Sequence, residues 1–496
     1  MNFSELMILT GNEKNIPDKN FDFTVNKLTF NSLNVEKNDI FFAVKGFNAD
    51  GNKFINDALQ KGAMAVITDG EPGISDNRIH KVQNVRKAMA VMSSAFFGSP
   101  SSKIKMIGVT GTNGKTTVTS LINFVLMKSG KKTGLIGTNG NFINNRYIKT
   151  EHTTPEAIDL NGILKQMADE NVEFAVMEVS SHSLALHRVY GLDFDIAVFT
   201  NLTPEHLDFH LDMDNYSASK KILFDSLKRI GSKGIQTAAI YNCNDEYGTK
   251  IVSGCEAERI AYGFGCGTYT AKNIKMDISG MKFDVLVPRN GENIEEISVK
   301  TRLTGKFNVH NILAAIAALH SINISYSDIT KYINEFEAVD GRFNRITLAN
   351  GADAIIDYSH TPDSLLKAIT TIREILTESK SKGKIITVFG CGGNRDKLKR
   401  PLMGDIAAKN SDHVIITSDN PRNEDPISII EDIKAGITSD NYSVEPDREM
   451  AIKKAIEMSR KNDIILIAGK GHETYQEIKG VKNHFSDREI TEKYGK

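Results

Sequence analysis

The sequence predicts an α/β protein with three domains. Short apolar runs alternate with helical patterns along most of the 496 residues, which is typical of parallel sheets covered by helices on both faces. This length suits roughly two to four domains, and the strand pattern restarts after residues 339–342. We therefore expect domains at residues 1–102, 103–339 and 340–496.

The first domain shows short strands and helices in alternation. Residues 38–46 form an apolar run that enters a glycine turn, so we expect a buried strand there. Residues 54–69 predict a helix, a glycine cap at Gly62 and a second strand. The stretch Gly-Ser-Pro-Ser-Ser at residues 98–102 is a candidate hinge before the second domain.

The second domain opens with a strand, a glycine loop and a helix. An apolar run at residues 104–109 ends at a loop that we expect to bind a nucleoside triphosphate, formed by Gly111, Thr112, Asn113, Gly114, Lys115, Thr116 and Thr117. This order presents backbone N–H groups and the positive end of a helix dipole to a polyanion. Lys115 would reach the β and γ phosphates, and the Thr116 hydroxyl would hold Mg²⁺. The usual phosphate-loop pattern needs glycine where Val109 stands, so a glycine turn without a ligand is the alternative.

The strand–helix alternation continues through the rest of this domain. Residues 132–138, 172–179 and 195–202 predict further strands, and residues 156–169 predict a helix. In a parallel sheet, ligands bind at the carboxyl ends of the strands. Glu178 and Ser180 lie at one such end, and His206 follows the next strand.

The third domain contains four buried-strand patterns, at residues 354–360, 384–393, 413–422 and 463–473. Each pattern ends in polar or glycine residues. We therefore expect a third α/β unit with its own row of functional strand ends.

The composition argues against several classes of partner. With 61 basic and 62 acidic side chains, the chain has no global field that would attract nucleic acid or anionic lipid. The longest apolar run, residues 312–319, is too short to span a membrane. We expect a cytoplasmic, monomeric protein with small-molecule substrates and no nucleic-acid or membrane partner. The cysteines are Cys243, Cys255, Cys266 and Cys391, and their spacing predicts free thiols in a reducing compartment.

Nine motifs in a fixed order identify a family resemblance. They are GTNGKTT (111–117), TTPE (153–156), MEVSSHSLALHRV (177–189), TNLTPEHLDFH (200–210), GKFNVHN (305–311), DYSHTPDS (357–364), FGCGGNRDKLKRPLM (389–403), SDNPR (418–422) and AGKGHETYQ (468–476). Together they resemble the Mur ligases of peptidoglycan synthesis over nearly the whole chain. The resemblance implies an N-terminal uridine-nucleotide-binding domain, a central P-loop ATPase domain and a C-terminal Rossmann-like domain that binds an amino acid.

The resemblance also implies a reaction. Mur ligases use ATP to convert a substrate carboxylate into an acyl phosphate, which a free amine then captures as an amide. Because a carboxylate and a triphosphate repel each other, metal ions are needed to neutralise the crowded oxygens. By the resemblance, the catalytic residues are Lys115, Glu178, His206 and Lys220. Glu178 and Thr116 would ligate one Mg²⁺; His206 and Lys220, the latter as a CO₂-derived carbamate (N6-carboxylysine), would ligate a second.

Other positions match the family's nucleotide contacts. Asn308 and Asn311 would line the adenine side, and Arg342, Asp357 and His360 would approach the nucleotide from the third domain. From the residues alone, Asn308 could equally cap a helix, and His360 could be a buried histidine with satisfied hydrogen bonds.

The resemblance further assigns residues to a UDP-N-acetylmuramoyl-dipeptide. These are Ser32, Phe47, Asn48 and Ala49 in the first domain, and Thr153, Thr154, Ser180 and Arg188 in the second. The chain departs from the family pattern at Asn31-Ser32-Leu33, which lacks two charges, and at His152 and Leu186.

The third domain is expected to determine which amino acid is added. By the resemblance, Arg395, Asp419, Asn420, Pro421, Arg422, Gly469 and Glu473 would hold meso-diaminopimelate. An arginine fork can bind the distal carboxylate of diaminopimelate with two parallel hydrogen bonds, and lysine lacks that carboxylate. The alternatives are a ligase that adds L-lysine, a P-loop switch that moves a partner, and a non-catalytic nucleotide-binding module.

Overall fold

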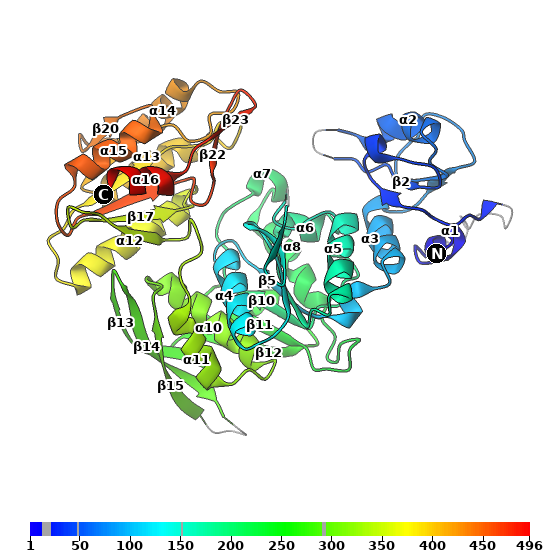
Figure 1. The fold of residues 1–496 in the computed structure, drawn as a ribbon, viewed down its shortest axis with the longest axis horizontal. Coiled ribbons are helices and arrows are strands. Elements are labelled where there is room, and N and C mark those ends of the chain that lie inside the picture. The colour runs from blue at the N-terminus through cyan, green and yellow to red at the C-terminus, as the bar shows by residue number, and fades with distance from the viewer. Residues whose placement is uncertain (12–20, 47–48, 150–151, 290–293) are drawn as a thin grey trace.

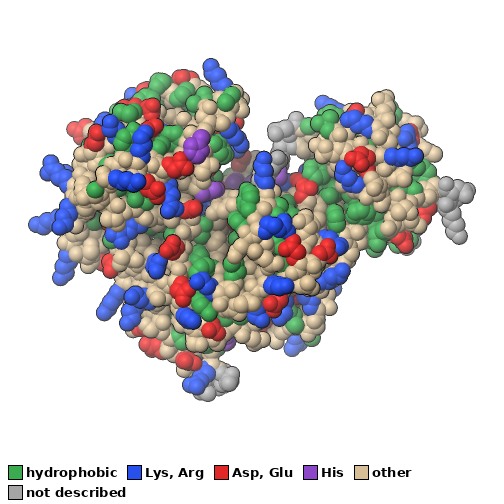
Figure 2. All heavy atoms as spheres, in the orientation of Figure 1, with side chains coloured by type: hydrophobic (Ala, Val, Ile, Leu, Met, Phe, Trp, Pro, Cys, Tyr) green, Lys and Arg blue, Asp and Glu red, His purple; other side chains and the backbone are tan. Residues whose placement is uncertain are grey.

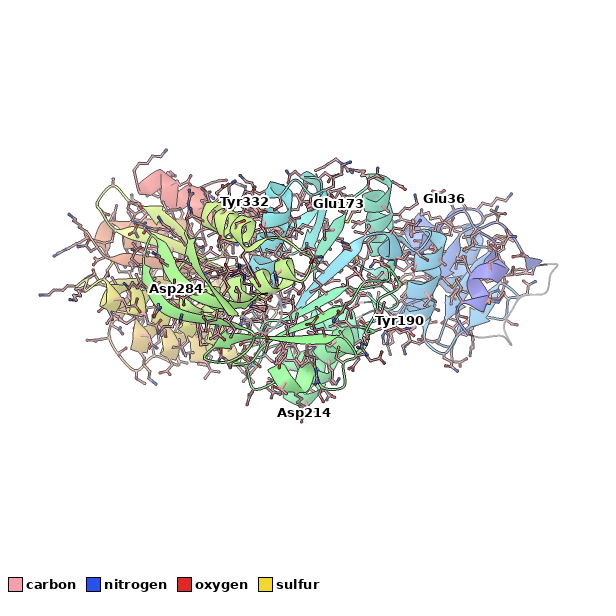
Figure 3. The ribbon with its side chains drawn as sticks, turned by 90° about the horizontal axis from the view of Figure 1, so that it is seen from below. Glu36, Glu173, Tyr190, Asp214, Asp284 and Tyr332 are labelled. Carbon is pink, nitrogen blue, oxygen red and sulfur yellow. A yellow bond between two sulfur atoms is a disulfide. The ribbon has the colours of Figure 1, made fainter. Side chains whose placement is uncertain are left out.

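The computed structural model describes residues 1–11, 21–46, 49–149, 152–289 and 294–496. It contains three β-sheets, each with its own helices, and a separate two-stranded hairpin (Figure 1). Seen from below in Figure 3, the N-terminal unit with Glu36 lies at one end of the molecule, and the central-unit strand with Asp284 overlaps the C-terminal unit at the other end. The α/β class with three units is as the sequence predicts.

The N-terminal unit is a four-stranded parallel sheet. Its strands are β1 (Leu28–Thr29), β2 (Ile40–Phe42), β3 (Ala65–Thr68) and β4 (Ile79–Lys81). Its helices are α1 (Phe3–Ile8), α2 (Ile55–Gln60) and α3 (Val85–Phe96), with 3₁₀ turns at Ser32–Asn34 and Gly51–Phe54. Apolar side chains of α1 and α3 pack on one face of the sheet and those of α2 on the other.

The central sheet has a parallel core, in the order β12, β11, β10, β5, β9 and β6. These strands are β12 (Glu258–Phe264), β11 (Ala238–Asn242), β10 (Ile196–Phe199), β5 (Lys105–Thr110), β9 (Phe174–Glu178) and β6 (Thr133–Gly137). Helices α4 (Lys115–Lys128), α10 (Lys306–His320) and α11 (Tyr326–Glu335) cover one face, and α5 (Ala157–Asp169) and α8 (Met213–Asp225) cover the other. Shorter helices are α6 (Ser181–Ala185), α7 (Leu207–His210) and α9 (Gly248–Ile251).

Beyond this core, antiparallel pairing extends the sheet at both edges, which the sequence did not indicate; the first added strand on one side still pairs with β12 in parallel. At one edge β13 (Tyr269–Asp277), β14 (Gly280–Pro288) and β15 (Ile294–Thr301) form a meander, and at the other β7 (Gly140–Ile143) and β8 (Arg146–Ile148) follow β6. Buried and exposed residues alternate along β14 and β15, as expected for strands with one solvated face.

The C-terminal unit is a six-stranded sheet in the order β16, β17, β21, β18, β19 and β20. Its strands are β16 (Asn344–Thr347), β17 (Asp353–Asp357), β21 (Ile464–Ala468), β18 (Ile385–Phe389), β19 (His413–Ile416) and β20 (Tyr442–Val444), and only β16 runs antiparallel. Helices α12 (Pro362–Glu378), α13 (Lys399–Asn410) and α14 (Pro426–Lys434) pack on one face, and α15 (Arg448–Met458) and α16 (Asp487–Tyr494) on the other. The hairpin is β22 (Tyr475–Ile478) with β23 (Val481–His484).

The candidate hinge at residues 98–102 and the junction at residues 339–342 are both packed segments. Residues 100–103 form a 3₁₀ turn in which Pro100 and Ser101 are buried, and Ser101 Oγ accepts a hydrogen bond from Asp193 N at 3.2 Å. A side chain at Gly341 would clash with the backbone of Gly471 and His472. Both junctions are therefore held by neighbouring structure.

The prediction of four free thiols is wrong for two cysteines. Cys243 and Cys266 form a disulfide, and Cys255 and Cys391 are free. The two bonded residues are 23 positions apart in the sequence and meet because each follows one of the neighbouring parallel strands β11 and β12. Among the described residues, no helix is both long and apolar enough to cross a membrane.

Candidate active site

A cavity of about 230 Å³ lies where the ends of β5, β9 and β10 meet the start of the C-terminal unit. It is lined by Thr112, Asn113, Gly114, Lys115, Thr116, Thr117, Thr138, Thr153, Glu178, Ser180, Glu205, His206, Arg342, Tyr358 and His360. All of these except Thr138, Glu205 and Tyr358 are residues that the sequence predicted for the site. Figure 2 shows histidine side chains around the hollow between the units.

Two glycines let the predicted phosphate loop take its shape. Gly111 and Gly114 have φ angles of +148° and +87°, which side chains rarely adopt. A side chain at Gly111 would clash with Thr200 Oγ1, and one at Gly114 with Asn311 Oδ1. Helix α4 begins directly after the loop, at Lys115, so its unpaired N–H groups and positive dipole end face the cavity.

Lys115 folds back over this loop. Its Nζ donates hydrogen bonds to the carbonyl oxygens of Gly111 and Thr112, both at 2.8 Å. Burial lowers the pKa of Lys115, although Glu205 and Glu178 act in the opposite direction. A phosphate group in the loop would offer this ammonium a stronger partner than two neutral carbonyls.

Glu178, at the end of β9, is 1% exposed and surrounded by donors. Its carboxylate accepts from Thr116 Oγ1 at 3.0 Å, from Thr138 N at 2.9 Å and from Thr138 Oγ1 at 3.2 Å. A side chain at Gly137 would clash with Glu178 Oε1, so the glycine makes room for the carboxylate. Thr138 was not anticipated because its partnership with Glu178 depends on the pairing of β6 with β9.

The oxygens of Thr116 and Glu178 are the hard ligands that Mg²⁺ prefers. Within the residues that the structure describes, no group of three or more His, Cys, Asp or Glu side chains could hold a metal ion. A Mg²⁺ ion bound to nucleotide phosphates usually takes only one or two protein carboxylates and completes its shell with phosphate oxygens and water. The donor set therefore fits a nucleotide-bound Mg²⁺ rather than an ion held by protein alone.

Glu205 is a carboxylate that the sequence analysis missed. It lies 3.8 Å from His206 Nε2 and 3.9 Å from His360 Nε2, which belongs to the C-terminal unit. Burial opposes its ionisation, but His206, His360, Lys115 and Lys220 together hold the pKa of Glu205 below its usual value. The sequence could have indicated Glu205, because it directly precedes His206 and follows a buried strand.

His206 and Lys220 lie on the same side of the cavity. His206 has a left-handed backbone, with φ +58°, and burial lowers its pKa. Lys220, on α8, does not line the cavity. It is 1% exposed, its Nζ lies 4.4 Å from the centre of the Tyr216 ring, and burial lowers its pKa well below the usual value. Tyr216 in turn shares a hydrogen bond of 3.1 Å with Thr112 Oγ1 of the phosphate loop.

Arg342 brings a cation from the C-terminal side. Its Nη2 donates to Thr116 Oγ1 at 3.4 Å, and its guanidinium lies 4.8 Å from the centre of the Tyr358 ring. Its Nε is buried without a hydrogen-bond partner among the described residues. An unpaired buried N–H facing a polar cavity is what an anionic ligand would satisfy.

Four residues predicted for the nucleotide do not line the cavity: Gly111 of the phosphate loop, Asn308, Asn311 and Asp357. The Asp357 carboxylate accepts hydrogen bonds from the backbone N–H groups of Phe343 and Ser359, at 2.8 and 3.0 Å. Burial raises the pKa of Asp357. Asn308 and Asn311, on α10, hydrogen-bond to each other at 3.0 Å, close to Gly114. They form the wall behind the phosphate loop.

The residues predicted for the muramoyl-dipeptide fall into two groups. In the central unit, Thr153 shares a hydrogen bond with Thr138 at 3.1 Å, Thr154 donates to the Glu178 carbonyl at 2.9 Å, and Ser180 caps α6. Ser32 and Ala49 lie in the N-terminal unit and do not line the cavity. Phe47 and Asn48 lie outside the described residues.

Arg188 has a carboxylate partner of its own. Its Nη2 lies 2.8 Å from Glu156, and Glu156 also pairs with Arg86 of α3, at 3.3 Å. All three side chains are at most 15% exposed, and Arg188 Nε is buried without a hydrogen-bond partner among the described residues. Sequence reasoning missed Arg86 and Glu156, because their pairing joins two units.

The residues predicted for the amino acid form a second cluster, after β19 and β21. Asn420 Nδ2 donates to Glu473 at 2.7 Å, and the buried Lys470 donates to Asn420 at 3.1 Å and to Glu473 at 3.3 Å. Gly469 leaves room for the Asp419 carboxylate, where a side chain would come within 2.7 Å. Lys470 was not predicted.

Arg422 follows in the same loop, after the buried Pro421, with a left-handed backbone of φ +50°. Its Nη1 donates to the Gly393 carbonyl at 2.8 Å, and its Nε lies 3.5 Å from Glu477. Arg395, on the facing loop, is exposed. Arg422 is therefore anchored but only loosely paired with an anion.

Comparisons with known proteins agree along the whole chain. Three family models match: the Mur ligase family catalytic domain at residues 24–105, the Mur ligase middle domain at residues 109–319, and the Mur ligase glutamate ligase domain at residues 341–471. The UDP-N-acetylmuramoyl-L-alanyl-D-glutamate–2,6-diaminopimelate ligases of Clostridium tetani and Clostridioides difficile are 42% and 43% identical, and each alignment covers at least 94% of both chains.

Solved structures give the same result. A UDP-N-acetylmuramoyl-L-alanyl-D-glutamate–2,6-diaminopimelate ligase superposes with a TM-score of 0.66 at 31% identity, covering 95% of this chain and 94% of that one. A MurF ligase from Thermotoga maritima in complex with ADP superposes with a TM-score of 0.63 over 92% of this chain and 96% of its own. At 18% identity this second likeness shows the fold alone.

Proposed function

This chain belongs to the Mur ligase family, and from that premise we propose that it joins meso-diaminopimelate to UDP-N-acetylmuramoyl-L-alanyl-D-glutamate at the expense of ATP. The N-terminal unit (1–102) would hold the uridine nucleotide, the central unit (103–339) ATP, and the C-terminal unit (340–496) the amino acid. The single observation that carries this proposal is the cavity in which the phosphate loop, Glu178 and Arg342 meet.

In the proposed reaction, the substrate carboxylate attacks the γ-phosphorus and forms an acyl phosphate, and the amine displaces phosphate to form the amide. Lys115, the N-terminus of α4 and Arg342 would stabilise the charge that spreads over the transferred phosphoryl group. Enclosure between units would exclude water, which would otherwise hydrolyse the acyl phosphate.

The chain's own residues fit two metal positions. Thr116 and Glu178 would hold one Mg²⁺, and His206 with carbamylated Lys220 would hold the second. When bound, the ions neutralise the phosphate and carboxylate oxygens as these approach each other. A lysine can be carbamylated only as the neutral amine, and the lowered pKa of Lys220 favours that form. Its side chain also forms no hydrogen bond or ion pair with the rest of the described chain.

The preference for diaminopimelate rests on Arg422. The Arg422 guanidinium is held in place by its hydrogen bond to the Gly393 carbonyl. Because its contact with Glu477 is loose, it can still bind the distal carboxylate of the incoming amino acid. Glu473 and Asn420 would receive the ammonium group beside it. With L-lysine the arginine would face a cation in place of an anion, which is unfavourable.

The decisive experiment supplies the purified protein with ATP, Mg²⁺ and the muramoyl-dipeptide nucleotide, and offers meso-diaminopimelate and L-lysine in parallel. We expect phosphate release and a new amide only when all substrates are present, and at least a hundredfold preference for diaminopimelate. In Arg422→Ala the KM for diaminopimelate should rise at least tenfold while the KM for ATP changes little.

Other results would favour the alternatives. Equal use of lysine would identify a lysine-adding ligase. ATP hydrolysis that is indifferent to the muramoyl-dipeptide would favour a P-loop switch.

A further inference from the structure

Helix α12 of the C-terminal unit begins directly beside the phosphate loop. Asp363, in its first turn, points one carboxylate oxygen, Oδ2, at three donors. These are Asn113 Nδ2 at 3.2 Å, Thr203 Oγ1 at 3.1 Å and Lys367 Nζ at 2.8 Å. Two of the three donors belong to the central unit, so this oxygen joins two units.

Asn113 is otherwise held by the central unit. The N–H of Asn113 donates to Asn201 Oδ1 at 3.0 Å, and its carbonyl accepts from Thr200 Oγ1 at 2.6 Å. Only the side-chain amide of Asn113 reaches across to the C-terminal unit. Asp363 therefore sets the orientation of a side chain in the phosphate loop.

Thr203 links the same oxygen to a second functional loop. Its N–H donates to Thr112 Oγ1 at 3.0 Å, and its carbonyl accepts from that hydroxyl at 3.2 Å. Two residues further on, the chain reaches Glu205 and His206 in the cavity wall. Asp363 thus bridges the loop that would hold the phosphates and the loop that carries His206.

We propose that Asp363 is a positioning residue that aligns the phosphate loop with the His206 loop once the C-terminal unit is in place. It makes amide formation depend on the position of the unit that delivers the amine. Asp363 does not line the cavity, so it acts through Asn113 and Thr203. The inference rests on the proposed ligase function, but its effect on nucleotide binding does not require that function.

The surroundings explain how a carboxylate is tolerated near a triphosphate. The positive end of the α12 dipole favours an anion in the first turn, and Lys367, one turn along α12, adds an exposed ion pair. The side chains of Asp363 and Lys367 are 30% and 43% exposed, so their ion pair contributes little by itself. The charge-assisted hydrogen bonds to Asn113 and Thr203 carry the effect.

The test compares Asp363→Ala and Asp363→Asn with Lys367→Ala as the matched control. For Asp363→Ala we expect kcat/KM for ATP to fall about tenfold or more, and MgADP to bind about fivefold more weakly in calorimetry. Asp363→Asn, whose amide oxygen can still accept from Asn113 and Thr203, should recover part of the loss. Lys367→Ala should stay within twofold of the parent.

The readouts separate positioning from folding and from the proposed function. We expect the thermal midpoint of Asp363→Ala to stay within about 2 °C of the parent, and the stimulation of phosphate release by the amino acid to be lost. Unchanged kinetics and MgADP affinity in Asp363→Ala, or an equal loss in Lys367→Ala, would overturn the inference. A parent that binds MgADP but forms no amide would refute the ligase function, and the MgADP comparison would still decide the role of Asp363.

Discussion

At the scale of single residues, Lys220 is the side chain whose surroundings least suit an ordinary lysine. It is buried behind the cavity, and its amine faces an aromatic ring rather than an anion. Burying an unpaired ammonium costs several kcal/mol, so the neutral amine is favoured. Carbamylation would convert this residue into an anion directed at the His206 side of the site.

We expect Lys220→Ala to lower amide formation by about a hundredfold, because one proposed metal ligand is lost. Acetate or formate should restore part of the activity by supplying a carboxylate at the vacated position. The measurement is the rate of phosphate release against carboxylate concentration.

Lys221→Ala is the neighbouring control. Lys221 is more exposed and pairs with Asp225, so its removal should leave the rate within about twofold. Failure of every small carboxylate to rescue Lys220→Ala would count against the carbamate.

Sequence reasoning found the residues that belong to recognisable motifs and missed their spatial partners. The loop from Thr112 to Thr117 was predictable because a glycine turn between a strand and a helix has a physical signature. Glu205 and Lys470 stand inside motifs, but their roles depend on which charged groups surround them after folding. The contacts of Asp357 with the backbone N–H groups of Phe343 and Ser359 likewise could not be foreseen from its motif.

At the scale of elements, strands buried on both faces were predictable and strands at the sheet edges were not. β21 is a continuous apolar run, β18 is apolar except for Thr387, and every residue of both strands is buried. β14 and β15 carry charged residues among their buried ones, so they resemble polar surface segments until their partners are known. The disulfide between Cys243 and Cys266 was missed for the same reason, since it depends on the pairing of β11 with β12.

Helices α15 and α16 offer a matched pair of ionic contacts. Arg448 and Asp487 are both fully buried at 2.7 Å, whereas Lys493 and Glu449 join the same helices at 2.7 Å with side chains 60% and 35% exposed. Arg448 Nη2 also donates to the carbonyl of Ala468, at the end of β21, at 3.0 Å. The buried pair therefore supports the strand end next to Gly469.

Asp487→Ala should destabilise the C-terminal unit by about 3–5 kcal/mol, because it leaves Arg448 buried without its anion. Glu449→Ala removes an exposed ion pair with Lys493 and the hydrogen bond that Tyr494 Oη donates at 2.8 Å, so it should cost only about 1 kcal/mol. Calorimetric melting of the two variants and the parent measures the difference. Equal shifts for the two variants would show that burial does not govern these contacts.

At the scale of the whole molecule, polar bridges join each outer unit to the central one. Glu156, just before α5, lies between Arg188 of the central unit and Arg86 of the N-terminal unit. Because Arg188 is one of the residues expected to hold the muramoyl-dipeptide, this bridge links that residue to the unit that would hold the uridine nucleotide. Neither Arg86 nor Glu156 could be paired from the sequence, because the bridge spans separately folded sheets.

Glu156→Ala should raise the KM for the muramoyl-dipeptide nucleotide about tenfold, because Arg188 loses the partner that orients it. The KM for ATP should stay within about twofold, since Glu156 does not line the cavity. Steady-state kinetics with each substrate varied in turn measures both constants.

Glu170→Ala is the control from the far end of the same helix, where Glu170 forms an exposed pair with Arg146. It should change neither constant. If Glu156→Ala raised the KM for ATP as much as the KM for the muramoyl-dipeptide nucleotide, the substitution would have disturbed the structure generally, and a specific role of the bridge would be refuted.

The left-handed backbones of His206 and Arg422 have a consequence for how this chain can vary. Non-glycine residues in that conformation cost of order 1–3 kcal/mol each, and both stand in the proposed sites rather than in ordinary surface turns. Asparagine or glycine would relieve that strain. A chain selected only for thermal stability would therefore be expected to replace His206 and Arg422 by glycine or asparagine. On this argument, His206 and Arg422 are kept for catalytic activity.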